Sequence, residues 1–99
     1  MPFVIRILNP DGAKVPPHWH PTDEHITVLT GTFIVGMGRT FDSAGGQALT
    51  AGSYMLVPKE MPHFATAKGD VIMQVHGIGP FQIIWVHPED DPAKKSSAR

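Results

Sequence analysis

Two histidines and a carboxylate are the residues of this chain whose types and spacing point most directly to chemistry. One residue separates His18 from His20, and Glu24 follows shortly after them. Because successive side chains of a β-strand point to opposite faces, both imidazoles can aim at one point. A turn at Pro21 would bring the carboxylate of Glu24 back toward that point. Two imidazoles and a carboxylate that converge are the ligand chemistry of a divalent transition metal.

The composition of the chain is that of a single small domain. It has 99 residues, a formal net charge of -1 and no cysteine. This charge gives no reason to expect a nucleic acid or an anionic membrane as a partner, and no apolar run is long enough to span a bilayer. Without cysteine, any metal must be bound by nitrogen and oxygen. The first residues lack the features of a secretory signal, so we expect a cytoplasmic location.

Ten glycines and ten prolines favour short strands over helices. Runs of β-branched and aromatic residues between turn signals predict strands at 3–8, 25–29, 32–37, 53–57, 63–67, 70–76 and 81–86. The runs at 63–67 and 70–76 are expected to form a hairpin across Lys68-Gly69. The segment 15–17 contains two prolines, which cannot donate to a ladder, and is expected at a sheet edge.

This series of strands predicts an all-β fold, either a sandwich or an antiparallel β-barrel of the jelly-roll type. The barrel is expected over residues 1–86. The polar segment 87–99 is expected to be a flexible C-terminal tail.

Glycines placed around the histidines define two spaced motifs. The fixed positions of the first are Gly12, His18, His20, Glu24 and Gly31. Those of the second are Gly52, Pro58 and His63. Together they resemble the two signature motifs of the cupin superfamily. The second motif departs from the family at Glu60, usually glycine, and at Ala67, often asparagine. The first departure falls in a turn, so it bears on turn type more than on metal binding.

The resemblance implies a small antiparallel β-barrel with one divalent transition metal ion per chain in its interior. Matched residue by residue, the metal ligands are His18, His20, Glu24 and His63. This donor set suits Mn, Fe, Co, Ni, Cu or Zn. It also leaves coordination positions open, as a Lewis-acid or oxygen-activating site requires. His25 is the alternative to Glu24 if the turn is shifted by one residue, although alternation otherwise turns it outward.

Two further polar residues, Gln74 and His76, share one face of an otherwise apolar strand. This pattern indicates either solvent exposure or a position beside the metal. In the second case both residues are candidate catalytic-site residues, with His76 as a general base or as a group that orients a metal ligand. Trp85 is expected in the core or in an interface.

The run 18–31, with Gln74–Gly77 and Gly79–Phe81, is similar to bacterial single-domain cupins of unassigned function. Those relatives carry additional strand-forming sequence before the position of Phe3. A missing strand would leave a bare barrel edge, so we expect a homodimer in which strands near the N-terminus pack against or exchange with the partner.

The resemblance favours a metal-dependent enzyme, of a dioxygenase or related oxidoreductase type, that acts on a small organic molecule. One alternative is a non-redox isomerase or lyase that uses the metal as a Lewis acid. The other alternative is a non-catalytic module that binds or senses a small molecule or a metal.

Overall fold

The computed structural model describes residues 1–93 of the chain. Its regular elements are β1 (Pro2–Asn9), β2 (Lys14–Trp19), β3 (Glu24–Met37), β4 (Gln47–Leu49), β5 (Tyr54–Val57), β6 (His63–Ile78), β7 (Ile84–Trp85) and the short 3-10 helix η1 (Pro88–Asp90). The strand pairings within these residues are antiparallel. The predicted all-β, single-domain barrel is therefore confirmed.

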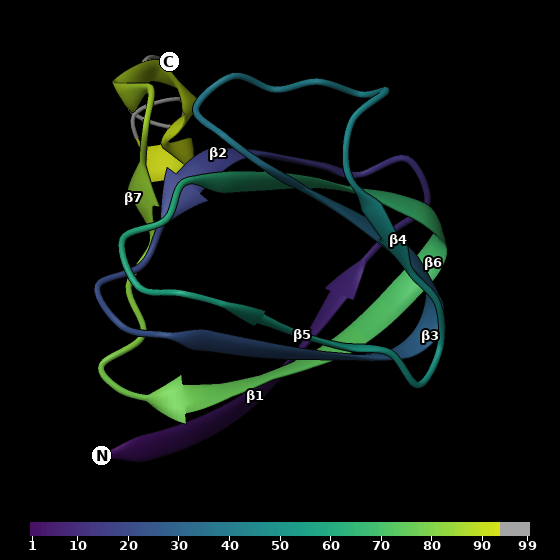
Figure 1. Ribbon diagram of the computed structural model, residues 1–99, viewed down its shortest axis with the longest axis horizontal. Helices are drawn as coiled ribbons and strands as arrows, with labels where there is room; N and C mark the ends of the chain where they lie inside the picture. The colour runs from purple at the N-terminus through teal and green to yellow at the C-terminus, as the bar shows by residue number, and fades with distance from the viewer. Residues whose placement is uncertain (94–99) are drawn as a thin grey trace.

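Two long strands, β3 and β6, run through both layers of the barrel. They pair from His25 with His76 at one end to Met37 with His63 at the other, and the register shifts on either side of Thr30. Both strands turn around the right-hand edge of the barrel in Figure 1. One layer combines the first half of β3 and the second half of β6 with β1 and β5. The other combines their remaining halves with β2, β4 and β7.

The bend lies at Gly31 of β3 and Gly69 of β6, where φ is +73° and +74°. A Cβ atom at Gly31 would lie 2.6 Å from the carbonyl oxygen of Asp70, so this close approach requires glycine. The strands expected on either side of Gly31 are thus one bent strand. The hairpin expected at Lys68-Gly69 is wrong. The chain bends at Gly69 without reversing, because β3 bends beside it and stays paired with β6 on both sides.

The two prolines of β2 lie at a register irregularity, in a part of the strand that has β6 as its only ladder partner. β2 pairs with β6 at Lys14, Val15 and His18, and with β7 at His18 and Trp19, so it has a neighbour on each side only at its C-terminal end. The register shifts between Val15 and His18, and Pro16–Pro17 fall within that shift. The irregularity accommodates two residues that cannot donate hydrogen bonds. The expected edge position holds for Val15 and Pro16, which have no ladder partner on the side of β7 within residues 1–93.

Alternate residues of β3 and β6 supply most of the core between the two layers. The buried apolar residues are Ile26, Val28, Phe33, Val35, Leu49, Val57, Phe64, Ala65, Ala67, Val71, Met73 and Val75. Four polar residues of the described chain are equally buried, namely His18, His20, Glu24 and His63. They lie at or beside strand ends away from the bend, on the side where Figure 1 places the N-terminus and η1.

The segment after β7 begins with contacts to the barrel. The backbone N–H of Val86 donates to the carbonyl oxygen of Pro17 at 3.0 Å. Nε2 of His87 lies 3.0 Å from the carbonyl oxygen of Arg39. The predicted tail 87–99 therefore starts as a docked segment, and its residues 94–99 lie outside the described residues. Across residues 1–93, no helix is long and apolar enough to cross a membrane.

Candidate metal centre

The four buried polar residues meet at one end of the barrel. His18 lies in β2, His20 follows directly after that strand, and Glu24 and His63 begin β3 and β6. His18 and His63 are paired across β2 and β6, so their side chains share a face. One ring nitrogen from each of the three histidines lies within 4.8 Å of the others. The convergence of His18 and His20 expected from their spacing is therefore present, and His63 joins them.

Each of the three imidazoles is held at Nδ1 by a backbone carbonyl. The distances are 2.7 Å from His18 to Pro16, 2.7 Å from His20 to Gln82 and 3.0 Å from His63 to Met61. Because a carbonyl oxygen only accepts, each Nδ1 must carry a proton, and Nε2 of the neutral ring keeps its lone pair. Such a bond fixes the tautomer and the direction of an imidazole that binds a metal.

The carboxylate of Glu24 faces two of the histidines. Its Oε1 lies 3.2 Å from Nε2 of His20 and 3.2 Å from Nε2 of His63. Even so, Oε1 of Glu24 and Nε2 of His20 are screened from solvent and have no well-directed hydrogen bond within residues 1–93. Buried polar atoms without a partner cost free energy, and a cation bound between these atoms would satisfy both. The residues present therefore fit a divalent transition metal.

Burial and charge move the pKa values of three of these groups. Burial, reinforced by the nearby His63, lowers the pKa of His18 to about 4. Burial opposes protonation of His20, but contact with the Glu24 carboxylate outweighs it and raises the pKa of His20. Burial likewise opposes ionisation of Glu24, but His20 and His63 lower the pKa of this carboxyl to about 2. At neutral pH, His18 is neutral and Glu24 is ionised, which are the forms that bind metals.

A small cavity opens beside the cluster. Its volume is about 140 Å³, its polar wall consists of Asn9, His18, His20 and Glu24, and its apolar wall consists of Ile7, Val15, Met73, Phe81 and Ile83. An adjoining space of about 40 Å³ shares His18 and Glu24 with it and reaches His63 and Phe33. The histidine cluster is therefore at the edge of a mostly apolar chamber.

Two aromatic side chains pack against the cluster. The ring of Phe81 stacks on His20, with centroids 4.9 Å apart. The ring of Trp85 lies 5.4 Å from that of His18. The sequence interpretation placed Trp85 in the core or an interface and assigned no role to Phe81. Both aromatic residues belong to the segment after β6. No sequence pattern predicts that this segment packs against the histidines.

Asn9 also lines the cavity and was not identified from the sequence. It ends β1 on the face of Phe3, Ile5 and Ile7, which pack against the core. Alternation from these apolar residues would have predicted an inward side chain. Its position before a proline was interpreted only as a turn signal.

The other predicted site residues, Gln74 and His76, lie on the outer face of β6. Met73 is buried between the two layers, so Gln74, the next residue of the strand, points to the opposite face, and His76 shares that face with it. Nε of Arg6 donates to Oε1 of Gln74 at 3.1 Å. The ring of His76 stacks on that of His25, with centroids 4.6 Å apart and planes 8° from parallel. The expected lining role for Gln74 and His76 is wrong, because the apolar residues of β6 take the inward positions. His25 faces outward, as alternation predicted.

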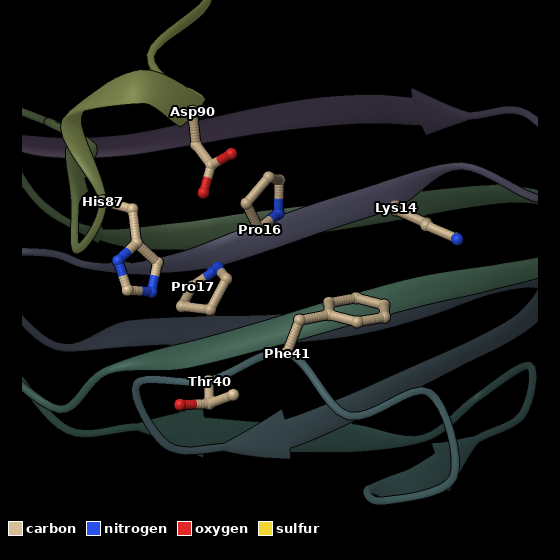
Figure 2. A pocket seen from close by; sticks show the side chains of 7 residues that line it. All are labelled: Lys14, Pro16, Pro17, Thr40, Phe41, His87 and Asp90. Atoms are coloured by element: carbon tan, nitrogen blue, oxygen red, sulfur yellow. The ribbon is translucent and has the colours of Figure 1, made fainter.

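A wider depression of about 370 Å³ lies on the outside of the barrel. It is lined by Lys14, Pro16, Pro17, Thr40, Phe41, His87 and Asp90. Figure 2 shows the two prolines in its middle, His87 and Asp90 toward one end, and Lys14 and Phe41 toward the other. Its ionisable groups do not converge, and no residue of the histidine cluster lines it. The cluster inside the barrel is therefore the better candidate for chemistry.

Fold and site together define a small antiparallel β-barrel with a histidine cluster at one end. The sequence matches the Cupin domain family over residues 4–87, so this chain belongs to the cupin family. The resemblance seen in the two motifs is thus confirmed. No curated protein matches the chain in sequence.

Several solved structures share the fold. The polyketide cyclase RemF from Streptomyces resistomycificus has a TM-score of 0.74 at 17% identity, covering 97% of this chain and 68% of that one. An oxalate oxidase has a TM-score of 0.68 at 26% identity, covering 86% of this chain and 46% of that one. A conserved protein of unknown function from Streptococcus pyogenes has a TM-score of 0.68 at 18% identity, covering 80% of this chain and 65% of that one. This chain therefore spans less than two thirds of the length of the last two.

Proposed function

We propose that this chain binds one divalent transition metal ion through His18, His20, Glu24 and His63. We further propose that it is a metal-dependent enzyme of the oxidoreductase type, close to the dioxygenases, acting on a small organic molecule. The observation that carries the proposal is the orientation of the three imidazoles. Each Nδ1 is bound by a carbonyl, so each Nε2 is left for the ion. When bound, Mn, Fe, Co, Ni, Cu or Zn supplies a Lewis acid or, for the redox-active ions, an electron-transfer centre.

The residues of the chain prepare the site for such an ion. The low pKa of Glu24, about 2, makes this carboxylate a source of negative charge and a weak proton acceptor at neutral pH. The stacked ring of Phe81 restricts the imidazole of His20. The apolar walls of the cavity exclude water and favour a ligand with a hydrocarbon body.

The assignment to oxidoreductases rests on two arguments. Four protein ligands leave coordination positions open on a six-coordinate ion, as binding of a substrate or of oxygen requires. In addition, the barrel is similar to that of an oxalate oxidase at 26% identity over 86% of this chain.

Elemental analysis of protein purified without an affinity-metal column tests the metal site. We expect about one transition metal ion per wild-type chain and none in His63→Ala. The matched control is His76→Ala, which removes an imidazole on the outer face of β6 and should keep the ion. A His63→Ala variant with the full metal content would overturn the site.

Oxygen consumption tests the reaction class. Protein loaded separately with Fe, Mn, Cu or Zn is mixed with a panel of small organic acids, ketones and phenols. We expect oxygen uptake with at least one redox-active ion and none with Zn. Turnover with Zn under anaerobic conditions would contradict the oxidoreductase assignment and favour an isomerase or lyase. Ligand binding without turnover under any condition would favour the binding module.

We also propose that the chain forms a homodimer through the outer face of the layer β1-β6-β3-β5. Large apolar side chains are exposed on this face, including Val4 and Leu8 at 63% and Leu56 at 44%. Arg6 is the one charged side chain at the paired positions of this face. Interface centres are poor in charge, and a twofold dimer requires a surface that complements itself. β1 also pairs with β6 alone within residues 1–93, which leaves its other edge free.

Light scattering at micromolar concentration tests the dimer. Wild type should have twice the mass of one chain, and Val4→Asp should shift toward the monomer because the charge would be buried in the interface. The control is Ala51→Asp, which adds the same charge at an exposed turn between β4 and β5. A monomeric wild type would overturn the dimer.

A further inference from the structure

The carboxamide of Asn9 is the polar group of the cavity that the proposed metal site does not use. Asn9 ends β1 and lines the cavity together with His18, His20 and Glu24. Its Nδ2 is screened from solvent and has no hydrogen-bond partner within residues 1–93. A buried donor without an acceptor is costly and rare in folded proteins, so its retention needs an explanation.

The position of Asn9 suggests that explanation. The metal-binding residues reach the cavity from β2 and β3, whereas Asn9 reaches it from β1. The other residues of the wall are apolar. The cavity therefore offers two places to hold a polar ligand atom, the metal and the carboxamide, within an apolar surround.

We propose that Asn9 positions the ligand of this cavity by donating a hydrogen bond from its amide N–H to a ligand oxygen, while a second donor atom of the ligand binds the metal. The terminal torsion of asparagine is broad and nearly two-fold, so the carboxamide can rotate to present its N–H without movement of β1. This inference rests on the proposed metal site and names the residue and the ligand class that complete it.

The cavity also restricts the size and charge of the ligand. Its volume of about 140 Å³ is close to the ~150 Å³ of an apolar cavity that holds benzene, which corresponds to roughly six non-hydrogen atoms. No lysine or arginine is among the residues that line it. A second negative charge on the ligand would therefore be buried without a counter-charge. The ligand class is a neutral or monoanionic oxygen compound with an apolar body, such as a monocarboxylate, an enolate or a phenolate.

Isobutyrate and imidazole separate the role of Asn9 from that of the metal. Isobutyrate can bind the ion with one oxygen and accept from Asn9 with the other, whereas imidazole binds the ion and has no oxygen to accept. Wild type, Asn9→Leu and Asn9→Asp are loaded with Co²⁺ and titrated with each probe, followed by the visible absorption of the ion. Both variants should bind isobutyrate about tenfold or more weakly than wild type, and imidazole within about twofold of it.

Succinate tests the charge restriction on the wild-type protein. It is a dianion whose second carboxylate would face apolar walls, and 4-methylpentanoate is the monoanion that matches it in shape and number of non-hydrogen atoms. We expect succinate to bind the Co²⁺-loaded protein at least about tenfold more weakly than 4-methylpentanoate. Equal affinity for the two would overturn the restriction to neutral and monoanionic ligands.

The outcomes distinguish this inference from the metal site on which it rests. A wild-type protein that does not bind Co²⁺ overturns the metal site and the inference together. Variants that hold Co²⁺ and bind isobutyrate as tightly as wild type overturn the role of Asn9 and leave the metal site intact. A wild type that holds Co²⁺ but does not bind isobutyrate also overturns the role of Asn9.

Discussion

Oε1 of Glu24 lies 3.2 Å from Nε2 of His20, and both residues are at most 5% exposed. A buried charge is costly unless a partner compensates it. In the metal-free protein the contact favours protonated His20, whose pKa it raises. A metal ion that takes the lone pair of Nε2 must displace this proton, so metal uptake should release protons and strengthen as pH rises.

The substitution Glu24→Gln should lower the pKa of His20 in the metal-free protein. The glutamine keeps the shape of the side chain but removes the negative charge that stabilises the protonated ring, and burial then dominates. The pKa is measured by an NMR titration of the imidazole proton signals. Glu60→Gln is the control, since Glu60 is exposed. An unchanged pKa of His20 in Glu24→Gln would show that the two side chains do not interact in solution.

His18 should make the metal-free protein less stable in mild acid. Its pKa is 6.5 in the unfolded chain and about 4 in the folded one, so the unfolded chain gains a proton first as pH falls. The contribution of neutral His18 to the free energy of unfolding is fully present above pH 6.5 and is lost progressively as pH falls toward 4. Between pH 7 and pH 5 the loss is about 2 kcal/mol.

Urea denaturation with a chelator present checks this expectation by comparison of wild type with His18→Gln, which cannot titrate at this position. The raised pKa of His20 acts in the opposite direction, because it adds stability below pH 6.5 that is lost as pH rises. Since both proteins keep His20, the difference between their pH dependences isolates His18. Wild type should lose more stability than the variant over this range. Identical pH dependences would be inconsistent with a neutral, buried His18.

Residue types and spacing were enough to predict the barrel and the convergence of its buried polar residues. Strand alternation placed His18 and His20 on one face, and that argument needs nothing beyond local geometry. The motif spacing then identified Glu24 and His63, which become neighbours only through the fold. The structure brings all four together, while their binding of a metal stays a prediction.

Local patterns failed where one strand determines the path of another. Gly69 follows a lysine between two apolar runs, as in a tight hairpin, yet it forms a bend because β3 bends beside it at Gly31. The alternating pattern of β6 likewise did not show which of its two sets of side chains faces inward. Gln74 and His76 were therefore expected at the site. Asn9 was missed because a turn signal next to it obscured its place in the alternation of β1.

The bend should be sensitive to any side chain at Gly31. Alanine there combines a positive φ of +73° with a Cβ 2.6 Å from the carbonyl oxygen of Asp70. Gly12 is a matched control, since its φ is +82° and a Cβ would meet nothing within 4 Å. We expect Gly12→Ala to cost about 1 kcal/mol and Gly31→Ala about 3 kcal/mol or more, measured as the free energy of unfolding in urea. Equal costs would mean that the two strands can separate at the bend without penalty.

Glu60, where the family usually has glycine, has a φ of +64°. The backbone keeps the left-handed conformation, and the N–H of Glu60 donates to the carbonyl oxygen of His20 at 2.8 Å, which connects this turn to the histidine cluster. Glu60→Gly should therefore stabilise the protein by about 1 kcal/mol in urea denaturation, since glycine adopts this conformation without steric cost. Lys59→Gly is the neighbouring control, where a negative φ offers no such gain and the added freedom of the unfolded chain should lower stability. If Glu60→Gly were destabilising to the same degree as Lys59→Gly, the turn would not have the left-handed conformation in solution.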